Sequence, residues 1–575
     1  MSESDTPTAE TVTPTEWSRP FANWPTLRVI SHYVTGLAFV AAIISQLVIW
    51  VIWEPVFGDS LKYLITYSMS LLLIFWGLGW WFVFAPVSWR TANTVGIPML
   101  IVVLAFFGSI RRLDMSGDMR AAIEFRWQPT REQRLAAHRE QMQSTPVEDL
   151  GEVPAITPED MPGYRGIQRD GVVIGPKLTQ DWEANPPEQL WRQPIGGGYA
   201  QFAVVGSLLV TIEQRGENEA IVCYDAKTGA ERWVYDYPAA FVEAMGGPGP
   251  RTTPTIDGDA VFVAGALGDI HCLSLLSGMK RWQVNVIKEY GLINTDWAMS
   301  SSPLVIGTKV IVNPGGPNGN GLVALHRDTG AVIWATEGIL DIKGTPERNR
   351  PGYSSPTLVE LFGVEQILNL DGTALRGHDP DTGEQLWSFP YENDAGVNAA
   401  QPILLPDGKI FLSASYNLGS TLVQLAYEEG KWSTSELWNS LDLRGKFSTA
   451  HLIDGYIYGV DEGIMVCLDP KTGERMWKGS REGLRGRYGH GQQLFTNGQL
   501  VILTESGDLV LMNPNPDHLE EVTHFKVLPD GKVWNPPALV GGRAYVRNAQ
   551  EMAAFDLRAE STPAATNDEV VSTAD

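Results

Sequence analysis

Cysteine, metal-binding spacings and positive charge are all scarce in this chain of 575 residues. Three cysteines are too few for a disulfide framework, and the sequence contains neither Cys-x-x-Cys nor His-Glu-x-x-His, so nothing in it predicts a zinc or other metal site. The 43 basic residues are outnumbered by 67 acidic ones, which gives a net charge of −24. Because no basic stripe is available to neutralise phosphates, the chain is not expected to bind nucleic acid.

What the sequence does have is a cassette that recurs along its second half. A small polar or acidic residue is followed three residues later by Thr-Gly or Ser-Gly, and a Trp stands four residues after the glycine. The cassette glycines are Gly229, Gly278, Gly330, Gly383 and Gly473, and the tryptophans are Trp233, Trp282, Trp334, Trp387 and Trp477. The copies are about 50 residues apart, except for one longer interval that Trp438 fills as a degenerate copy; such a period is typical of radial or stacked repeats.

Each cassette lies between stretches that have the pattern of short strands. Around the first copy, residues 220–224 and 231–235 are rich in apolar and β-branched residues, and the Asp-Ala-Lys-Thr-Gly between them is a turn sequence. Asp-Gly or Asn-Gly hairpin signals recur at 257–258, 407–408, 454–455 and 497–498. Each repeat is therefore predicted to form four antiparallel strands, the blade of a β-propeller, with its Trp packed between neighbouring blades.

The strand count also predicts how the ring closes. Seven repeats fit between residues 200 and 526, and the remaining stretch offers only three strands, at 537–540, 544–547 and 552–557. The missing strand is expected at 189–192, where Trp191 is equivalent to the cassette tryptophans. The prediction is an all-β, eight-bladed propeller whose last blade is closed by this N-terminal strand, which removes exposed sheet edges. A seven-bladed ring is the alternative if residues 519–527 do not belong to a blade.

Ahead of the repeats lie three long apolar runs, at residues 34–53, 64–85 and 91–110. Each is long enough to cross a hydrocarbon core of about 30 Å, and tryptophans cluster near their ends, so three transmembrane helices are predicted. The expected organisation is a polar tail at 1–28, a membrane anchor at 29–112, a charged and partly helical linker at 113–160, the propeller at 161–558 and a disordered acidic tail at 559–575.

The repeated Asp-x-x-Thr-Gly-x-x-x-Trp cassette makes residues 162–557 similar to the PQQ-like propeller repeat family. The resemblance implies either a quinoprotein alcohol dehydrogenase, which binds pyrroloquinoline quinone (PQQ) and Ca²⁺ on the propeller axis, or a non-catalytic propeller such as the scaffold of the outer-membrane barrel-assembly machinery. The Pro-Gly-Tyr-Arg-Gly at 162–166 and the Arg-Asp-Gly at 169–171 look like the lead-in of membrane-anchored bacterial members. Such members imply a bacterial inner membrane with the propeller on the periplasmic side, although Arg111 and Arg112 after the third run favour the opposite orientation.

Two functions are compatible with this resemblance. The alcohol dehydrogenase branch typically carries two adjacent cysteines against its cofactor, and this sequence has no such pair. That absence favours a non-catalytic binding or scaffold module at the cell envelope, with a protein or small-ligand partner on one propeller face. The alternative is a PQQ-dependent alcohol or sugar dehydrogenase that holds PQQ and Ca²⁺ and passes electrons to the membrane quinone pool.

Candidate site residues are the polar side chains expected near the propeller axis. Under the dehydrogenase hypothesis the catalytic candidates are His490, Glu505 and Asp461, and the cofactor-binding candidates are Arg251, Lys446, Arg487, Tyr488, Arg547 and Asn548. The densest group is 485–491, where basic and aromatic residues stand between glycines that let the main chain approach a ligand. A purely structural interpretation is that the basic residues pair with Glu462 and Glu505 across the channel mouth.

Overall fold

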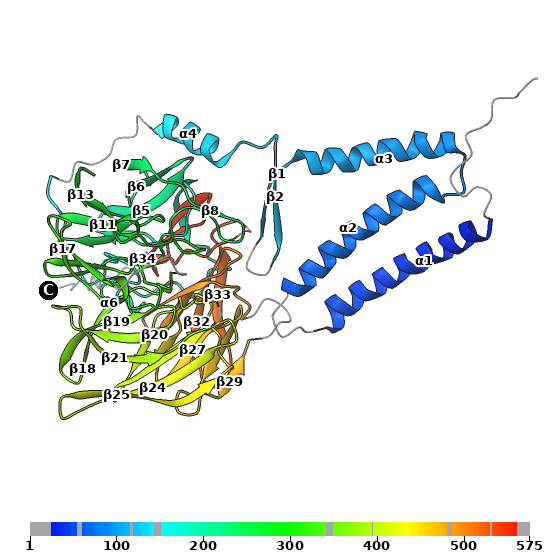
Figure 1. Cartoon of the computed structure of the whole chain (residues 1–575). Helices are drawn as coiled ribbons and strands as arrows, with labels where there is room; N and C mark the ends of the chain where they lie inside the picture. The colour runs from blue at the N-terminus through cyan, green and yellow to red at the C-terminus, as the bar shows by residue number, and fades with distance from the viewer. Residues whose placement is uncertain are drawn as a thin grey trace, which may run out of the picture. The chain divides into compact units, whose positions relative to one another are not determined.

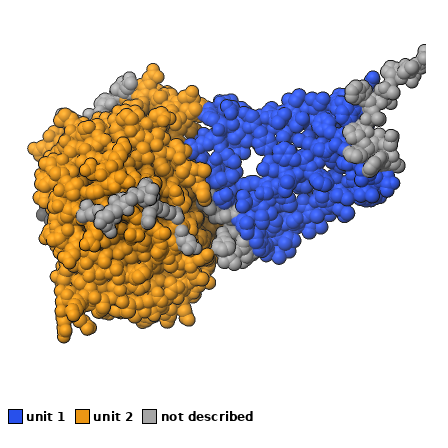
Figure 2. Space-filling view, in the orientation of Figure 1, with its two compact units in different colours: residues 1–128 blue, residues 129–575 orange. Residues whose placement is uncertain are grey.

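The structure is a computed structural model that describes residues 25–53, 60–115, 119–142, 151–340, 349–393, 395–479, 486–529 and 532–559. The predictions for the N-terminal tail up to residue 24, for Arg485 and for the tail from residue 560 onward lie outside these ranges. The chain divides into two compact units, Met1–Gln128 and Pro129–Asp575 (Figure 2).

The first unit consists of long apolar helices followed by a hairpin. Its elements are α1 (Pro25–Leu47), its π-helical continuation η1 (Val48–Ile52), α2 (Ser60–Val83), α3 (Trp89–Ser109), β1 (Ile110–Met115) and β2 (Ala121–Phe125). Helix α2 packs against both α1 and α3 (Figure 1). Three stretches, Thr26–Ile52, Leu61–Val83 and Trp89–Ser109, are long and apolar enough to cross a membrane, with mean hydropathies of 2.2, 1.5 and 1.8. This confirms the three predicted helices.

The second unit contains eight four-stranded antiparallel sheets, the blades of a propeller (Figure 1). Blade 1 is β4 (Ala203–Val205), β5 (Leu208–Arg215), β6 (Asn218–Asp225) and β7 (Glu231–Pro238); blade 2 is β10 (Thr255–Asp257), β11 (Ala260–Ala264), β12 (Asp269–Ser274) and β13 (Lys280–Asn285). Blade 3 is β14 (Leu304–Ile306), β15 (Lys309–Val312), β16 (Val323–His326) and β17 (Val332–Ala335); blade 4 is β18 (Thr357–Leu361), β19 (Val364–Leu370), β20 (Ala374–His378) and β21 (Gln385–Pro390).

The later blades follow the same plan. Blade 5 is β22 (Ile403–Leu405), β23 (Lys409–Ala414), β24 (Gly419–Glu428) and β25 (Lys431–Ser440); blade 6 is β26 (His451–Ile453), β27 (Tyr456–Asp461), β28 (Ile464–Leu468) and β29 (Arg475–Lys478). Blade 7 is β30 (Gln492–Thr496), β31 (Gln499–Leu503), β32 (Asp508–Asn513) and β33 (Glu520–Lys526). Short elements between blades are β8 (Val242–Glu243), β9 (Gly247–Pro248), α5 (Val286–Glu289) and α6 (Glu337–Leu340).

Blade 8 closes the ring with a strand from the other end of the propeller sequence. It is formed by β34 (Ala538–Val540), β35 (Arg543–Arg547), β36 (Glu551–Asp556) and, as the outermost strand, β3 (Glu188–Pro194). Strand β3 pairs antiparallel with β36, with Trp191 opposite Ala554. The predicted closure by the N-terminal strand is therefore confirmed. Because residues 520–526 form β33, the ring has eight blades, and the seven-bladed alternative is wrong.

Four tryptophans each join their own blade to the next through a cassette glycine. The Nε1 of Trp233 donates to Leu275 O at 2.8 Å, and a Cβ built on Gly278 in the same turn would lie 2.6 Å from the Trp233 ring. The same pair of contacts links Trp191 to Ala226 O and Gly229, Trp282 to Arg327 O and Gly330, and Trp438 to Pro470 O and Gly473. Only glycine leaves room for the ring and accepts the positive φ of the turn, so the Gly-to-Trp spacing records an inter-blade contact.

Trp387 departs from this pattern for a visible reason. It points toward blade 5, whose outer strands β24 and β25 are joined by a hairpin at 428–431 without a cassette. Its Nε1 donates instead to Gln366 Oε1 at 2.6 Å within its own blade. Trp438, the degenerate copy, is the blade 5 member and contacts Gly473 in the ordinary way. The predicted packing of the tryptophans between blades thus depends on the turn of the following blade.

The three cysteines occupy one equivalent position in three blades. Cys223, Cys272 and Cys467 are buried free thiols, each opposite the Trp of its own blade in the strand register. Burial raises the pKa of Cys223 to about 12 and that of Cys272 to about 11. These thiols pack as small apolar groups and are not activated as nucleophiles.

Substitution of a cassette glycine tests the inter-blade contact. Gly278→Ala is expected to lower the free energy of unfolding by about 2–4 kcal/mol, because it combines left-handed strain at φ +69 with overlap against Trp233. The matched control is Gly216→Ala, which has φ +63 but nothing within 4 Å of the added Cβ, so it carries the strain alone. The measurement is the urea-unfolding midpoint of the full chain in detergent. Equal losses in the two variants would contradict the contact.

A buried acid lies between blades 1 and 2. Glu219 is fully buried; its Oε1 accepts a hydrogen bond from Ala266 N at 3.0 Å, and Tyr237 donates its hydroxyl to Oε2. Burial raises the pKa of Glu219 to about 7, although both hydrogen bonds act in the opposite direction. His271, whose ring lies 4.2 Å from that of Tyr237, is also buried, and burial lowers its pKa to about 3. The cluster is therefore neutral on its His side and titrates at Glu219.

This raised pKa predicts a pH dependence of stability. Folded Glu219 keeps its proton up to about pH 7 while the unfolded residue loses it near pH 4.5, so its contribution is complete below pH 4.5 and is lost as the pH rises through 7. Glu219→Gln mimics the protonated form, so the variant does not lose this stability as the pH rises. The contribution of His271 is the same in both proteins and cancels in the comparison. The stability of the variant relative to wild type should increase by up to about 3 kcal/mol between about pH 5 and 8. A difference independent of pH in urea unfolding would contradict the assignment.

Candidate functional site

The residues that precede β3 pack against the propeller, first through a helix. Helix α4 (Arg131–Met142), which matches the helix predicted in the linker, lies over the seam between blades 8 and 1. Its His138 Nε2 is 3.1 Å from Gln193 Oε1 on β3, and Arg139 Nε donates to Glu231 Oε2 on β7 at 2.9 Å. Leu135 is buried between them. The helix thus covers the strands that close the ring.

Residues 161–173, here called the hub segment, pair with the innermost strands of several blades. Met161 and Val204 of β4 exchange main-chain hydrogen bonds at 3.0 and 2.7 Å, and Ile256 N of β10 donates to Pro162 O at 2.7 Å. Farther along, Val173 N donates to Phe495 O of β30 at 2.8 Å. Since these strands belong to blades 7, 1 and 2, which with blade 8 are consecutive in the ring, the hub segment lies along one side of the axis. The sequence 162–171, noted above for its family resemblance, is part of this segment.

Two arginines of the hub segment are buried and bonded to main-chain carbonyls. Arg165 donates to Gln493 O at 3.3 Å and to Asp170 O at 2.7 Å, and its Nη2 is 3.3 Å from His451 Nε2. Arg169 donates to Ser302 O and Pro303 O at 3.0 and 2.8 Å. Burial lowers the pKa of both guanidinium groups, that of Arg169 to about 10. Burial, followed by the nearby Arg165, lowers the pKa of His451 to about 3, so its ring is neutral, and its Nε2 also lies 3.3 Å from Gln493 O.

Beside the hub segment lies a pocket of about 480 Å³, here called the hub pocket. It is bounded on one side by Arg165, Gln168, Arg169, Asp170 and Val172 of the hub segment. The opposite wall is formed by the innermost strands β18, β22 and β26 of blades 4, 5 and 6, through residues 357–360, 401–404 and 449–452. The hub segment therefore occupies only part of the channel, on the side of blades 7, 8, 1, 2 and 3.

The other end of the axis, where loops lead from one blade into the next, is covered by aromatic rings. Tyr199 and Trp534 lie 5.3 Å apart between ring centroids, Trp534 and Phe447 5.1 Å, and Phe447 and His490 5.3 Å. These four residues come from four different inter-blade loops, which can meet only near the axis. Lys532 extends the row, with its ammonium 4.6 Å from the Trp534 ring centroid.

Of the predicted cofactor-binding residues, Arg251 lies beside this row. Its guanidinium stands 5.7 Å from the ring centroid of Tyr199 and 5.2 Å from that of Phe241, and its Nη2 is 3.4 Å from Glu243 Oε1. Burial lowers the pKa of Arg251, and the charges of Tyr199, Glu243 and Tyr353 oppose that effect. Cation–π contacts and an acid thus balance its charge within the protein.

Three other candidates face the protein interior. Arg547, fully buried, donates to Thr211 Oγ1, Ile212 O and Gly196 O and so ties blade 8 to blade 1. Asn548 Oδ1 accepts from Gln550 N and Glu551 N and closes the turn before β36. Tyr488 is buried and donates its hydroxyl to Glu521 Oε2 at 3.0 Å, and burial raises its pKa well above the ordinary range.

The catalytic candidates are divided between two places. Asp461 is buried and holds Arg444 and Lys478 at 2.8 and 2.5 Å, so hydrogen bonds from these bases outweigh its burial and lower its pKa. Glu505 and His490 are adjacent, with Glu505 Oε2 accepting from the His490 main-chain N–H at 3.0 Å. Lys446 and Arg487 are half-buried in the loops before β26 and β30. Arg251 and His490 thus lie at opposite ends of the aromatic row, and Asp461 lies in a separate ion cluster.

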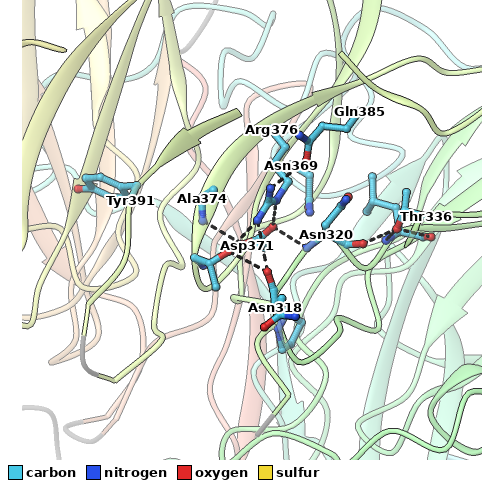
Figure 3. Close-up of polar contacts among 12 residues, drawn as sticks. Asn318, Asn320, Thr336, Asn369, Asp371, Ala374, Arg376, Gln385 and Tyr391 are labelled. Atoms are coloured by element: carbon cyan, nitrogen blue, oxygen red, sulfur yellow. Dashed lines mark hydrogen bonds and ion pairs between the residues drawn. The ribbon is translucent and has the colours of Figure 1, made fainter. Parts of the chain in front are cut away.

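Asp371, another acid near the axis, is likewise surrounded by donors (Figure 3). Its Oδ1 accepts from Thr373 N and Ala374 N, and its Oδ2 accepts from Arg376 Nε at 2.6 Å and from Asn320 N at 2.9 Å. Across the described ranges, no three His, Cys, Asp or Glu side chains are grouped so that they could hold a metal ion. Asp461 and Asp371 already neutralise Arg444, Lys478 and Arg376, so these two carboxylates do not fit the role of Ca²⁺ ligands.

The comparisons with known proteins agree with the blade plan. A family model described as outer membrane protein assembly factor BamB matches residues 182–350 and 296–479, which together are just over half of the sequence. The chain belongs to this family of PQQ-like propellers. No curated protein matches it.

Solved structures with a similar fold include both kinds of propeller. BamB from Moraxella catarrhalis aligns over 64% of this chain and 99% of its own, at 15% identity and a TM-score of 0.44. Quinohemoprotein alcohol dehydrogenase from Comamonas testosteroni aligns over 75% of this chain and 84% of its own, at 13% identity and a TM-score of 0.42. A europium-containing methanol dehydrogenase aligns over 70% and 99%, at 11% identity and a TM-score of 0.42. At these values the matches do not distinguish an enzyme from a scaffold.

Several residues at the axis were missed by reasoning from the sequence. They are the aromatic and basic side chains Tyr199, Phe241, Phe447, Lys532 and Trp534, and the two buried arginines of the hub segment. A usable signal existed for the first group, since each of these residues stands between the last strand of one blade and the first strand of the next, as Arg251 and His490 do.

Removal of a hub arginine should loosen the segment from the inner strands. Arg165→Met keeps the stem but leaves Gln493 O and Asp170 O without this donor, so the free energy of unfolding should fall by about 1–3 kcal/mol. Hydrogen exchange at the Val173 and Phe495 amides should become faster. Lys177→Met, at an exposed site that follows the hub segment, is the control and should change neither the free energy of unfolding nor the exchange rates. Unaltered exchange in Arg165→Met would show that the hub segment is held by its main-chain bonds alone.

Proposed function

We propose that this protein is a membrane-anchored, non-catalytic propeller that serves as a binding or scaffold module at the cell envelope. The observation that carries the proposal is the pairing of the buried acids and bases around the axis. Asp461 holds Arg444 and Lys478, Asp371 holds Arg376, and the buried arginines of the hub donate to main-chain oxygens. In this interpretation, these charged side chains stabilise the ring.

A quinone-dependent dehydrogenase needs cations for the cofactor carboxylates, oxygen ligands for Ca²⁺ and a carboxylate as general base. Two of the cationic candidates are already engaged within the protein. Arg251 is covered by two aromatic rings and faces Glu243, and Arg547 is bonded on several sides inside the seam. The sequence adds that no adjacent cysteine pair is available to pack against a quinone.

Location completes the proposal. The three apolar helices of the first unit are the membrane anchor, and the family resemblance favours the bacterial inner membrane with the propeller on the periplasmic side. A partner protein or a small ligand binds one part of the propeller surface or channel. In this interpretation the tryptophans and glycines of the repeat stabilise the platform, and the binding specificity lies elsewhere.

The proposal is tested against PQQ chemistry with the full chain in detergent. After incubation with PQQ and Ca²⁺ and removal of free cofactor, we expect no cofactor absorbance on the protein. We also expect no dye reduction with a panel of alcohols and aldose sugars above a control without PQQ. A quinoprotein dehydrogenase purified in the same detergent verifies the assay. PQQ-dependent dye reduction that is abolished by Asp461→Asn or Glu505→Gln would overturn the proposal in favour of the dehydrogenase.

A further inference from the structure

The innermost strand of a blade turns one main-chain edge toward the axis, and the hub segment covers that edge in four blades. The contact falls each time at the last but one residue of the strand. Val204 and Ile256 bond to the main chain of Met161 and Pro162, Phe495 bonds to Val173 and Gly171, and Leu539 N lies 3.1 Å from Met161 Sδ. Three of these blades thus hydrogen-bond the main chain of the hub segment at the same register position, and blade 8 contacts the Met161 side chain there.

In blades 4, 5 and 6 the equivalent residues line the hub pocket instead. They are Glu360 of β18, Leu404 of β22 and Leu452 of β26. Leu404 is opposite Ile410 in its hairpin just as Val204 is opposite Leu209, so its N–H and C=O face the axis in the same way. Strand β22 is the middle one of the three, which makes its edge the centre of the pocket wall.

We propose that the hub pocket binds an extended peptide of a partner protein, which adds to β22 as a further strand. This inference rests on the proposed function as a binding module and names its ligand. The mode is the one the protein already uses internally, where Met161 and Val204 exchange two main-chain hydrogen bonds, and Arg165 and Val172 of the same hub segment line the pocket. The pocket volume of about 480 Å³ suits such a segment.

The pocket lining indicates which peptide would bind. Leu404 and Val172, 37% and 48% exposed, offer apolar contacts on opposite walls for alternate side chains. The accessible charges at the rim are the carboxylates of Asp170 and Glu360, because Arg165 and Arg169 are buried and bonded to carbonyls. The preferred ligand is therefore an extended peptide that alternates apolar residues and carries lysine or arginine at its ends.

The experiment measures fluorescence anisotropy of a labelled synthetic peptide, alternating valine and threonine between terminal lysines, with the full chain in detergent. We expect saturable binding at or below about 1 mM. A peptide N-methylated at alternate residues loses the donors that a strand needs, and one with terminal glutamates reverses the charge; each should bind at least about tenfold more weakly. Hydrogen exchange of the wild-type chain should slow at the Leu404 amide on peptide addition and stay unchanged at Val204.

A pair of variants in blade 5 localises the site. Leu404→Arg fills the pocket and should weaken binding at least about tenfold. Leu437→Arg, at a 47% exposed position on the outer strand β25 of the same blade, should leave it unchanged. If Leu404→Arg does not fold, the N-methylated peptide and the exchange pattern decide without it.

Three results would overturn the inference: no binding up to about 1 mM, equal affinity of the N-methylated peptide, or protection that maps outside β18, β22 and β26. Each of these leaves the scaffold proposal standing, because that proposal fails only on PQQ-dependent activity. Conversely, PQQ-dependent dye reduction together with unimpaired peptide binding would refute the non-catalytic scaffold function and leave the peptide-binding site standing.

Discussion

The ring depends on one strand that its last blade cannot supply. Blades 1 to 7 are each built from consecutive strands, but β34–β36 leave blade 8 one strand short, and β3 completes it from the other end of the propeller sequence. Pairing β3 with β36 closes a long loop, which is unfavourable in chain entropy. The resulting ring has no open sheet edges. The same constraint brings the preceding residues to the ring, because the chain must reach β3 from outside. Helix α4 lies over the seam and the hub segment bonds to the inner strands before β3 begins.

Occupation of the hub by the chain itself determines what chemistry the axis offers. Arg165 and Arg169 donate to carbonyl oxygens in or just before inner strands, and their burial lowers their pKa without removing their charge. At the opposite end, Tyr199, Phe447, His490 and Trp534 fill the axis with rings. Acids such as Asp461 and Asp371 are paired with bases. Beside the hub segment lies the hub pocket, whose wall includes the inner strands of blades 4, 5 and 6 and on which we propose that a peptide binds.

The eight blades, the closing strand and the apolar helices could all be predicted because each leaves a local mark. The Gly-to-Trp spacing is fixed within one blade, although its cause, the ring of Trp233 against the turn at Gly278, lies between two blades. The candidate site was harder. Arg547 and Asn548 bond within the blade 8–blade 1 seam and its turn, and Glu505 accepts a main-chain hydrogen bond from His490. The residue type and its position in an inter-blade loop can suggest that a polar side chain lies near the axis. They do not indicate which neighbouring side chain pairs with it.

By itself, the sequence determined the repeat, the number of blades, the end of the chain that closes the ring and the presence of helices long enough to span a membrane. These follow from periodicity, turn chemistry and apolar length, which are properties of neighbouring residues. Only the tertiary structure decided that the lead-in segment enters the hub, that its arginines are buried there, and that blades 4 to 6 are left with a pocket. The physical reason is that these features arise where residues hundreds of positions apart meet at the axis, and no local pattern records which strand edges such a meeting covers.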